Sequence, residues 1–254
     1  MTIATSDSGG GAGIQADLKA FAAAGAHGQS VFVALTAQST TAVAAVHTLP
    51  ADFVRAQLDA CFGDIGVDAA KTGMLFSREL IETVADDLQG RGVPLVVDPV
   101  MVASSGAKLL QDDAVEALVG RLFPLASVVT PNLPEAEALT GAAGASQREL
   151  AERLVDLGAP AALVTGGHGD TAADHLFDGR AHVEIPVARH DVRATHGAGC
   201  THSATLCAGL ARGLSLVEAS RVASRASARA VRDGLVELGR GEGPVNVLGI
   251  GRAA

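Results

Sequence analysis

The segment Gly197-Ala198-Gly199-Cys200 places three small residues before a cysteine, and an apolar run typical of a helix follows it. Backbone N–H groups at the start of a helix point outward together, and with the positive end of the helix dipole they attract an anion. A thiol at such a position is expected to have a lowered pKa. Cys200 is therefore either a reactive group beside an anion hole or a buried, space-filling residue. A redox role lacks a nearby partner motif.

A second glycine-rich stretch, SDSGGGAG over residues 6–13, follows the first apolar run. Glycines allow the backbone to approach a ligand and to point N–H groups at it. The dinucleotide-binding pattern G-x-G-x-x-G fails, because its last position falls on Ile14 when counted from Gly9. The phosphate-binding P-loop pattern is absent as well. The stretch is either a ligand-binding loop or a tight turn between a strand and a helix.

Polar side chains also stand at the ends of other apolar runs. The amide of Gln38 offers a donor and an acceptor, which suits the edge of an aminopyrimidine. Asp98 directly follows a strand pattern, where it suits a site for metal and phosphate or caps the next turn. Asn132 and Glu135 are three residues apart, so they suit either a hydrated Mg²⁺ or a helix N-cap with its capping box.

Composition limits the classes of protein that the chain can belong to. Its 254 residues are 48% hydrophobic and 19% charged, which is typical of a soluble globular protein. The formal net charge of −9 argues against general binding of nucleic acid or anionic membranes. The three cysteines are widely spaced, which argues against a disulfide framework or a zinc site. With no signal-peptide pattern and no apolar run of about 18 residues, we expect a cytoplasmic protein.

Short β-rich runs alternate with helical patterns along the chain. This alternation predicts a mostly parallel sheet covered by helices on both faces, in a single domain spanning residues 1–254. In such folds ligands bind beyond the carboxyl ends of the strands. The predicted strands are Thr2–Thr5, Ser30–Thr36, Ala42–His47, Val67–Lys71, Pro94–Asp98, Ser127–Thr130 and Ala161–Thr165, followed by an edge hairpin of His175–Phe177 and His182–Val187.

Three helices carry clear boundary signals. A helix from about Ile14 ends at Gly25, and capping-box spacing at Ser146 and Ser215 predicts two more helices, the first of them ending at Gly158.

Taken together, the motifs resemble the ribokinase-like superfamily, and within it the hydroxymethylpyrimidine/phosphomethylpyrimidine kinases of thiamin biosynthesis. The resemblance is carried, in family order and over nearly the whole chain, by SDSGGGAGIQADLK (6–19), ALTAQ (34–38), DIGVDAAKTGML (64–75), VVDPVMV (96–102), VTPNLPEAEALTG (129–141), GGH (166–168), THGAGCTHSA (195–204) and GPVN (243–246). It implies a three-layer α/β/α sandwich. It also implies transfer of the γ-phosphoryl group of ATP, with Mg²⁺, to hydroxymethylpyrimidine and then to its monophosphate.

The resemblance also implies roles for individual residues. The pyrimidine side comprises Asp17, Gln38, Met74 and Thr5. The metal side comprises Asp98 and Glu135. The side for ATP and its phosphates comprises Asn132, Thr165, Gly167 and Lys71. The anion hole is formed by Gly197, Ala198, Gly199 and Cys200, with Cys200 where most of the superfamily has an Asp base. A homodimer is implied as well.

Three positions depart from the family pattern: Thr5 replaces a glycine, Ser104 replaces a lysine, and Thr165 replaces the lysine of KGGH. The last change removes a cation that reaches the transferring phosphate, and such a loss lowers the rate on the order of a hundredfold or more. We expect another cation to reach the phosphates instead, and the candidates are Arg189, Arg193 and Lys71.

Two other functions stay open from the sequence. Thr5 reshapes the pyrimidine pocket, so a kinase for pyridoxal-type vitamins is the first alternative. The missing lysine motivates the second, a non-catalytic sensor that binds a pyrimidine without transferring phosphate. A nicotinamide-dependent oxidoreductase is disfavoured because the dinucleotide pattern fails.

Overall fold

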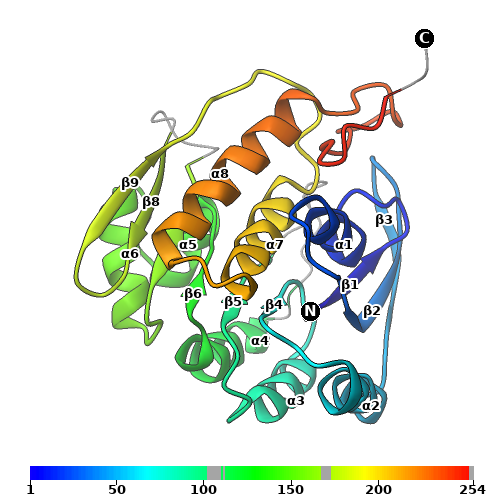
Figure 1. The fold of residues 1–254 in the computed structure, drawn as a ribbon, viewed down its shortest axis with the longest axis vertical. Helices are drawn as coiled ribbons and strands as arrows, with labels where there is room; N and C mark the ends of the chain where they lie inside the picture. The colour runs from blue at the N-terminus through cyan, green and yellow to red at the C-terminus, as the bar shows by residue number, and fades with distance from the viewer. Residues whose placement is uncertain (102–109, 111, 167–172, 252–254) are drawn as a thin grey trace.

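The structure is a computed structural model, and it describes residues 1–101, 110, 112–166 and 173–251. Within them, one nine-stranded sheet runs through the molecule (Figure 1). Its strands are β1 (Thr2–Asp7), β2 (Ser30–Gln38), β3 (Val43–Thr48), β4 (Ala70–Thr72), β5 (Leu95–Val97), β6 (Val128–Val129), β7 (Ala162–Val164), β8 (Ala173–Phe177) and β9 (His182–Pro186).

The sheet has the order β3-β2-β1-β4-β5-β6-β7-β8-β9. The pairs from β2 through β1 and β4 to β7 are parallel. At the two edges, β3 pairs antiparallel with β2, and β8 and β9 add an antiparallel hairpin beside β7. The chain first builds outward from β1 to β3 and then returns to β4 on the other side of β1. The strand order therefore reverses between β1 and β4, the position where ligands bind in open parallel sheets.

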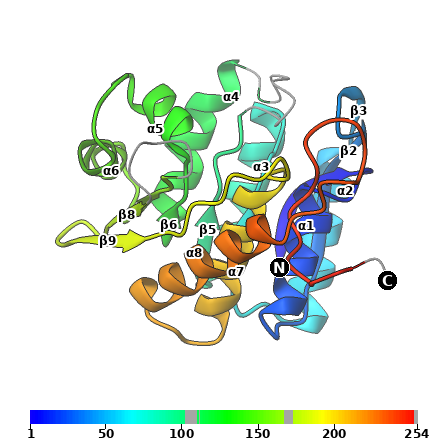
Figure 2. The same cartoon turned by 90° about the horizontal axis from the view of Figure 1, so that it is seen from above.

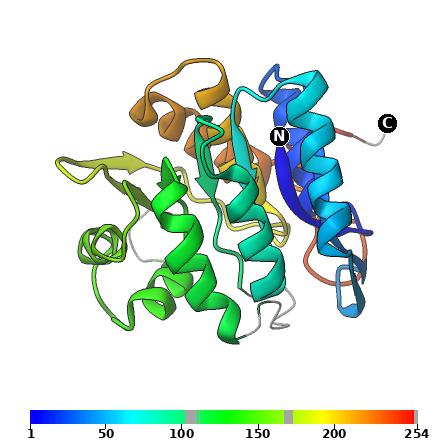
Figure 3. The ribbon, with the colours of Figure 1, turned by 90° about the horizontal axis from the view of Figure 1, so that it is seen from below.

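Helices cover both faces of the sheet (Figure 2). The helices α1 (Gly13–Ala23), α7 (Ala198–Ala211) and α8 (Leu216–Arg232) lie on one face. The other face carries α2 (Ala51–Ala60), α3 (Arg78–Leu88), α4 (Asp112–Ala117), α5 (Leu133–Thr140) and α6 (Gln147–Asp156). Short helical turns at Cys61–Ile65, Leu118–Leu122 and Phe123–Leu125 extend two of these helices. Seen from the opposite side, α2 and α3 run next to each other (Figure 3).

Alternate residues of each strand supply the two hydrophobic cores. Leu95 and Val97 pack into the core beneath α2 to α6, whereas Val96 between them packs beneath α1, α7 and α8. This follows from the strand geometry, in which successive side chains point to opposite faces. Strands buried on both faces need to be apolar throughout, and all three residues of β5 are buried.

The expected three-layer α/β/α architecture is confirmed. Each predicted strand is present within a few residues of its expected bounds, including the antiparallel edge hairpin. The capping boxes at Ser146 and Ser215 form as predicted. In each, the Ser side chain accepts the backbone N–H of the Glu three residues later, and the Glu side chain accepts the backbone N–H of the Ser. Among the described residues, no helix is both long and apolar enough to cross a membrane.

Candidate active site

The carboxyl edge of the parallel strands gathers most of the residues singled out in the sequence. Gln38 is the last residue of β2, Asp98 directly follows β5, and Thr165 directly follows β7, while Asp7, which the sequence did not single out, ends β1. Parallel strands end at the same edge of a sheet, so the register alone brings these positions to one side of the molecule. The start of α7 reaches the same edge, because the Ser203 hydroxyl donates to Asp98 Oδ2 at 2.7 Å.

A buried ion cluster lies under this edge. Lys71 Nζ is 2.9 and 3.0 Å from the two carboxylate oxygens of Asp17 and 3.6 Å from Asp98 Oδ2. The Lys71 and Asp17 side chains have no exposed surface, and the Thr2 hydroxyl donates to Asp17 Oδ2 at 2.6 Å. Burial alone would lower the pKa of Lys71, but the nearby carboxylates of Asp17 and Asp98 raise it above its ordinary value. The ammonium therefore stays charged and links β4 to α1 and β5.

This cluster corrects two roles expected from the sequence. Asp17 lies on the inward face of α1, on the buried stripe that also contains Ile14 and Phe21. Its oxygens accept hydrogen bonds from Lys71 and Thr2, so it presents no surface to the edge of a pyrimidine. Lys71 is equally committed to two carboxylates, which leaves it badly placed to substitute for the lysine missing at Thr165. The sequence pattern missed this because the two partners are 54 residues apart.

The two carboxylates expected to hold a metal, Asp98 and Glu135, approach each other. Asp98 is 4% exposed and Glu135 is 9% exposed. Burial, together with the negative charge of Asp98, raises the pKa of Glu135 to about 8. One ammonium on Lys71 serves both Asp17 and Asp98, so negative charge remains on this side of the site. Such a site is suited to a cation.

Asn132 and Glu135 also form the helix cap that their spacing predicts. Asn132 Oδ1 accepts the Glu135 N–H at 2.9 Å, and Glu135 Oε2 accepts the Asn132 N–H at 3.0 Å. Thr165 lies beside this cap, because residues 132 and 165 form a parallel bridge and the Thr165 N–H donates to Pro131 O. The structure thus joins three predicted residues, whereas Gly167 and Ser104 lie outside the described residues.

The expected anion hole has the backbone geometry of a helix start. Gly197 caps α7 with φ +84°, a left-handed conformation, and a Cβ there would lie 1.8 Å from Gly11 O. Only glycine tolerates both conditions. The first helical hydrogen bond runs from the Thr201 N–H to Gly197 O, so the N–H groups of Gly199 and Cys200 precede it. The two glycine-rich stretches of the sequence therefore meet at this point.

The prediction of a lowered thiol pKa at Cys200 is wrong. Burial raises the pKa of Cys200 to about 12, although Lys71 and an N–H from Gly13 act in the opposite direction. Asp17 and Asp98 add to the increase. Desolvation and two nearby carboxylates thus outweigh the helix dipole, which the local sequence could not show. Cys200 is a neutral thiol at the edge of the anion hole.

Three of the residues expected to contact the pyrimidine lie in two separate groups: Thr5 with Met74, and Gln38 with His196. The Thr5 hydroxyl donates to Met74 O at 3.0 Å and lies 3.6 Å from Met74 Sδ, so the departure at Thr5 directly touches the residue expected near the ring. Gln38 lies on β2, and its side-chain nitrogen is 3.5 Å from His196 Nε2. His196 Nε2 is in turn 3.1 Å from Asp7 Oδ2.

Sequence reasoning missed the roles of Asp7, His196 and Ser203. Each residue lies within one of the motifs that carry the family resemblance, but its position in that motif did not indicate its partner. Ser203 follows Cys200 by three residues and so shares its helix face, which is a usable signal once the helix is placed.

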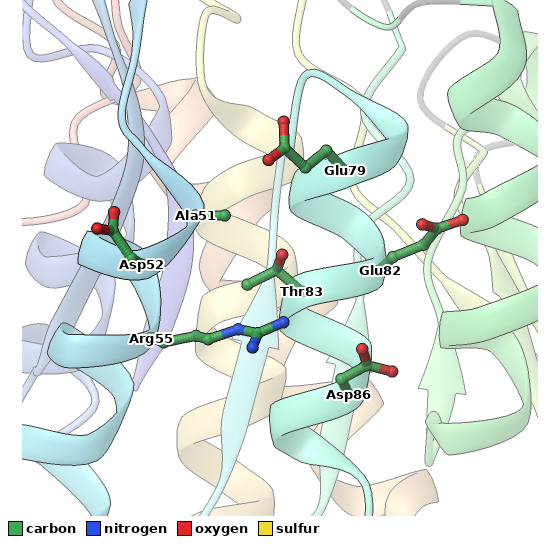
Figure 4. Close-up of a pocket in the computed structure, with 7 residues that line it drawn as sticks. All are labelled: Ala51, Asp52, Arg55, Glu79, Glu82, Thr83 and Asp86. Carbon is green, nitrogen blue, oxygen red and sulfur yellow. The ribbon is translucent and has the colours of Figure 1, made fainter.

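A shallow cavity of about 420 Å³ lies elsewhere, in the groove between α2 and α3 (Figure 4). Its lining is mostly acidic and includes none of the predicted site residues: Ala51, Asp52, Arg55, Glu79, Glu82, Thr83 and Asp86.

Replacing Lys71 by Met should leave two buried carboxylates unpaired, and we expect a loss of about 3–5 kcal/mol in the free energy of unfolding. The double variant Lys71→Met/Asp17→Leu should recover a large part of this loss. Urea denaturation measures both. Lys19→Met is the control, because the Lys19 ammonium is partly exposed and donates to a backbone carbonyl, Gly10 O. A Lys71→Met variant no less stable than Lys19→Met would contradict the role of the ion cluster.

The neutral thiol of Cys200 makes alkylation slow at neutral pH. Iodoacetamide labelling, followed by mass spectrometry of the Cys200 peptide, should show a rate that still rises well above about pH 8, because only the thiolate reacts. The buried Cys207 reports on unfolding during the experiment. A rate that levels off below that pH would show that the pKa of Cys200 is lowered after all.

Comparison with known proteins identifies the family and the fold. The family model described as phosphomethylpyrimidine kinase matches residues 7–246. The hydroxymethylpyrimidine/phosphomethylpyrimidine kinase of Rhizobium meliloti (strain 1021) is 50% identical over 97% of this chain and 95% of its own. Among solved structures, an ADP complex of Bacillus subtilis pyridoxal kinase superposes with a TM-score of 0.89 at 36% identity, covering 96% of this chain and 95% of the other. Phosphomethylpyrimidine kinase from Clostridium difficile 630 superposes with a TM-score of 0.78 at 40% identity, covering 88% of this chain and 94% of the other. The chain belongs to the phosphomethylpyrimidine kinase family.

Proposed function

We propose that this protein phosphorylates 4-amino-5-hydroxymethyl-2-methylpyrimidine and then its monophosphate, with ATP as the donor, in thiamin biosynthesis. The observation that carries this proposal is the junction of α7 with β5. There the Ser203–Asp98 hydrogen bond holds the helix start of residues 197–200 against the carboxylates of the metal side. An anion hole facing a cation site is the arrangement that phosphoryl transfer needs. The identity to the Rhizobium meliloti kinase supports the substrate.

ATP use is supported by the ADP complex of the similar Bacillus subtilis enzyme. Mg²⁺ fits the residues present. Burial and the charge of Asp98 raise the pKa of Glu135, and a cation held by these two carboxylates would relieve their repulsion. Within the described residues no group of three or more His, Cys, Asp or Glu side chains forms a metal cage. This suits Mg²⁺, which keeps several waters and uses few carboxylates.

The residues of the chain then divide the work. Asp98 and Glu135 would hold Mg²⁺, which when bound neutralises charge on the phosphate oxygens. The N–H groups at the start of α7 bind the transferring phosphoryl group. Cys200, as a neutral thiol, orients the attacking hydroxyl and is not a ready base. Phosphoryl transfer tolerates this, because its loose transition state depends mainly on alignment and charge stabilisation. The homodimer and the cytoplasmic location remain predictions from the resemblance and the composition.

A coupled assay for ADP formation tests the activity. We expect turnover with hydroxymethylpyrimidine and with its phosphate. In the Asp98→Asn variant the rate should fall by about a hundredfold or more, the size expected for losing a charge contact in the transition state. The Asp59→Asn variant is the matched control, because Asp59 is an exposed carboxylate on α2 that pairs with Arg91. No turnover of either pyrimidine by the folded protein would refute the proposal.

Pyridoxal is the second candidate substrate, because the Bacillus subtilis structure with a TM-score of 0.89 is a pyridoxal kinase and because Thr5 alters the pocket beside Met74. A panel of both substrates under the same conditions discriminates between them. A sensor without activity predicts stabilisation by the pyrimidine without ADP formation.

The cation that takes over from the missing lysine is proposed to be Arg189 or Arg193, which are exposed in the segment between β9 and α7. Replacing the responsible Arg by Ala should lower turnover by about tenfold or more, and Thr165→Lys should restore part of it. Arg180→Ala, in the turn between β8 and β9, is the control. If neither Arg189→Ala nor Arg193→Ala lowers turnover more than the control does, this assignment is wrong.

A further inference from the structure

His196 stands where three parts of the site meet. It directly precedes Gly197, the cap of α7. Its backbone pairs with the C-terminal segment, since its N–H donates to Gly243 O and its carbonyl accepts from the Val245 N–H. Its ring lies against the first glycine-rich stretch so closely that a Cβ on Gly11 would be 2.3 Å from His196 Cδ2. The imidazole is therefore held on several sides and is 8% exposed.

Asp7 fixes which atom of the ring faces the site. Its carboxylate accepts the N–H groups of Gly9, Gly11 and Ala12, and Oδ2 is 3.1 Å from His196 Nε2. Burial would raise the pKa of Asp7, but the contacts with His196 and with these N–H groups hold it below its usual value. An ionised carboxylate only accepts hydrogen bonds, so His196 Nε2 carries a hydrogen in either charge state of the ring.

Gln38 is clamped next to this N–H. The Ser8 hydroxyl contacts both the N–H and the carbonyl of Gln38, at 2.8 and 2.9 Å, which fixes the main chain. The side-chain amide lies between two groups: Oε1 is 3.2 Å from Thr36 Oγ1, and Nε2 is 3.5 Å from His196 Nε2. The Thr36 hydroxyl also donates to Ser6 O at 2.9 Å.

The donors and acceptors around this amide favour one orientation. An amide nitrogen and an imidazole N–H are both donors, so they cannot bond to each other. The single hydroxyl hydrogen of Thr36 is needed by Ser6 O, so its oxygen is better used as an acceptor. Turning the amide by half a rotation places its oxygen toward His196, where it shares with Asp7 Oδ2 the single hydrogen on Nε2, and places its nitrogen toward Thr36.

We propose that His196, oriented by Asp7, is a positioning residue that sets the amide orientation of Gln38 and thereby the choice between aminopyrimidines and oxopyrimidines. In the favoured orientation Gln38 keeps one N–H and one oxygen lone pair for the ligand, in a fixed order. An aminopyrimidine offers a ring-nitrogen acceptor beside an amino donor, and the 4-oxo analogue offers the reverse. An amide free to turn would accept both, whereas a fixed one selects. The inference rests on the proposed function, because it takes Gln38 as the pyrimidine contact.

The test compares kcat/KM for 4-amino-5-hydroxymethyl-2-methylpyrimidine and for its 4-oxo analogue. The wild-type protein should prefer the amino compound. His196→Met removes the donor at similar length and should lower the preference about tenfold, the size expected for two hydrogen bonds. His196→Gln, which can present a side-chain N–H in a similar place, should keep most of the preference. The KM for ATP should change little in both variants.

His202→Met is the matched control. His202 is a second buried histidine and lies on α7, but its ring is near Asp174 and Ser224, at 3.4 Å from each. It should lower stability without changing the preference. A purely structural role of His196 predicts equal losses for both pyrimidines, and an unchanged preference in His196→Met would overturn the proposal. If the wild-type protein phosphorylates neither compound, the proposed function fails. The inference is then tested on its own by measuring how much each pyrimidine stabilises the protein against heat in the absence of ATP. The wild-type protein should be stabilised more by the amino compound, and His196→Met should lose this difference. Equal stabilisation of the wild-type protein by both compounds, or an unchanged difference in His196→Met, would contradict the inference.

Discussion

The buried ammonium of Lys71 is the contact on which the rest of the site depends. It joins α1 through Asp17, lies on β4, and approaches Asp98 after β5. Asp98 in turn accepts from Ser203 on α7. These elements flank the position where the strand order reverses, so a single charged group connects the helices of one face to the strands that carry the chemistry. Buried charges of this kind add specificity only when each is paired, because an unpaired one is costly to desolvate.

The same cluster sets the electrostatics of the site. Two carboxylates around one ammonium leave excess negative charge, and Glu135 lies close enough to Asp98 for its pKa to rise. Burial, to which the charges of Asp17 and Asp98 add, raises the pKa of the Cys200 thiol, although Lys71 and the helix dipole favour the thiolate. A site that repels a thiolate attracts a divalent cation. The negative charge that favours the proposed Mg²⁺ therefore also adds to the raised pKa values of Glu135 and Cys200.

Most of the architecture could be predicted from the sequence because its signals are local. Each strand is a short apolar run, and the boxes at Ser146 and Ser215 are read within four residues. The spacing of Asn132 and Glu135 offered two alternatives, a helix cap or a metal site, and the structure forms the cap. Partners far apart in the chain were not predictable. Asp7 and His196 are separated by 189 residues, and no local pattern links them.

The sequence by itself determined the succession of strands and helices along the chain, the glycines that permit close backbone approach, and the polar residues at the strand ends. These depend on the period of the apolar residues and on backbone conformation, which are properties of short segments. Only the tertiary structure decided that Asp17 and Lys71 neutralise each other in the core and that Cys200 stays neutral. Both outcomes depend on desolvation and on charges brought together from distant segments, and neither quantity exists until the chain has folded.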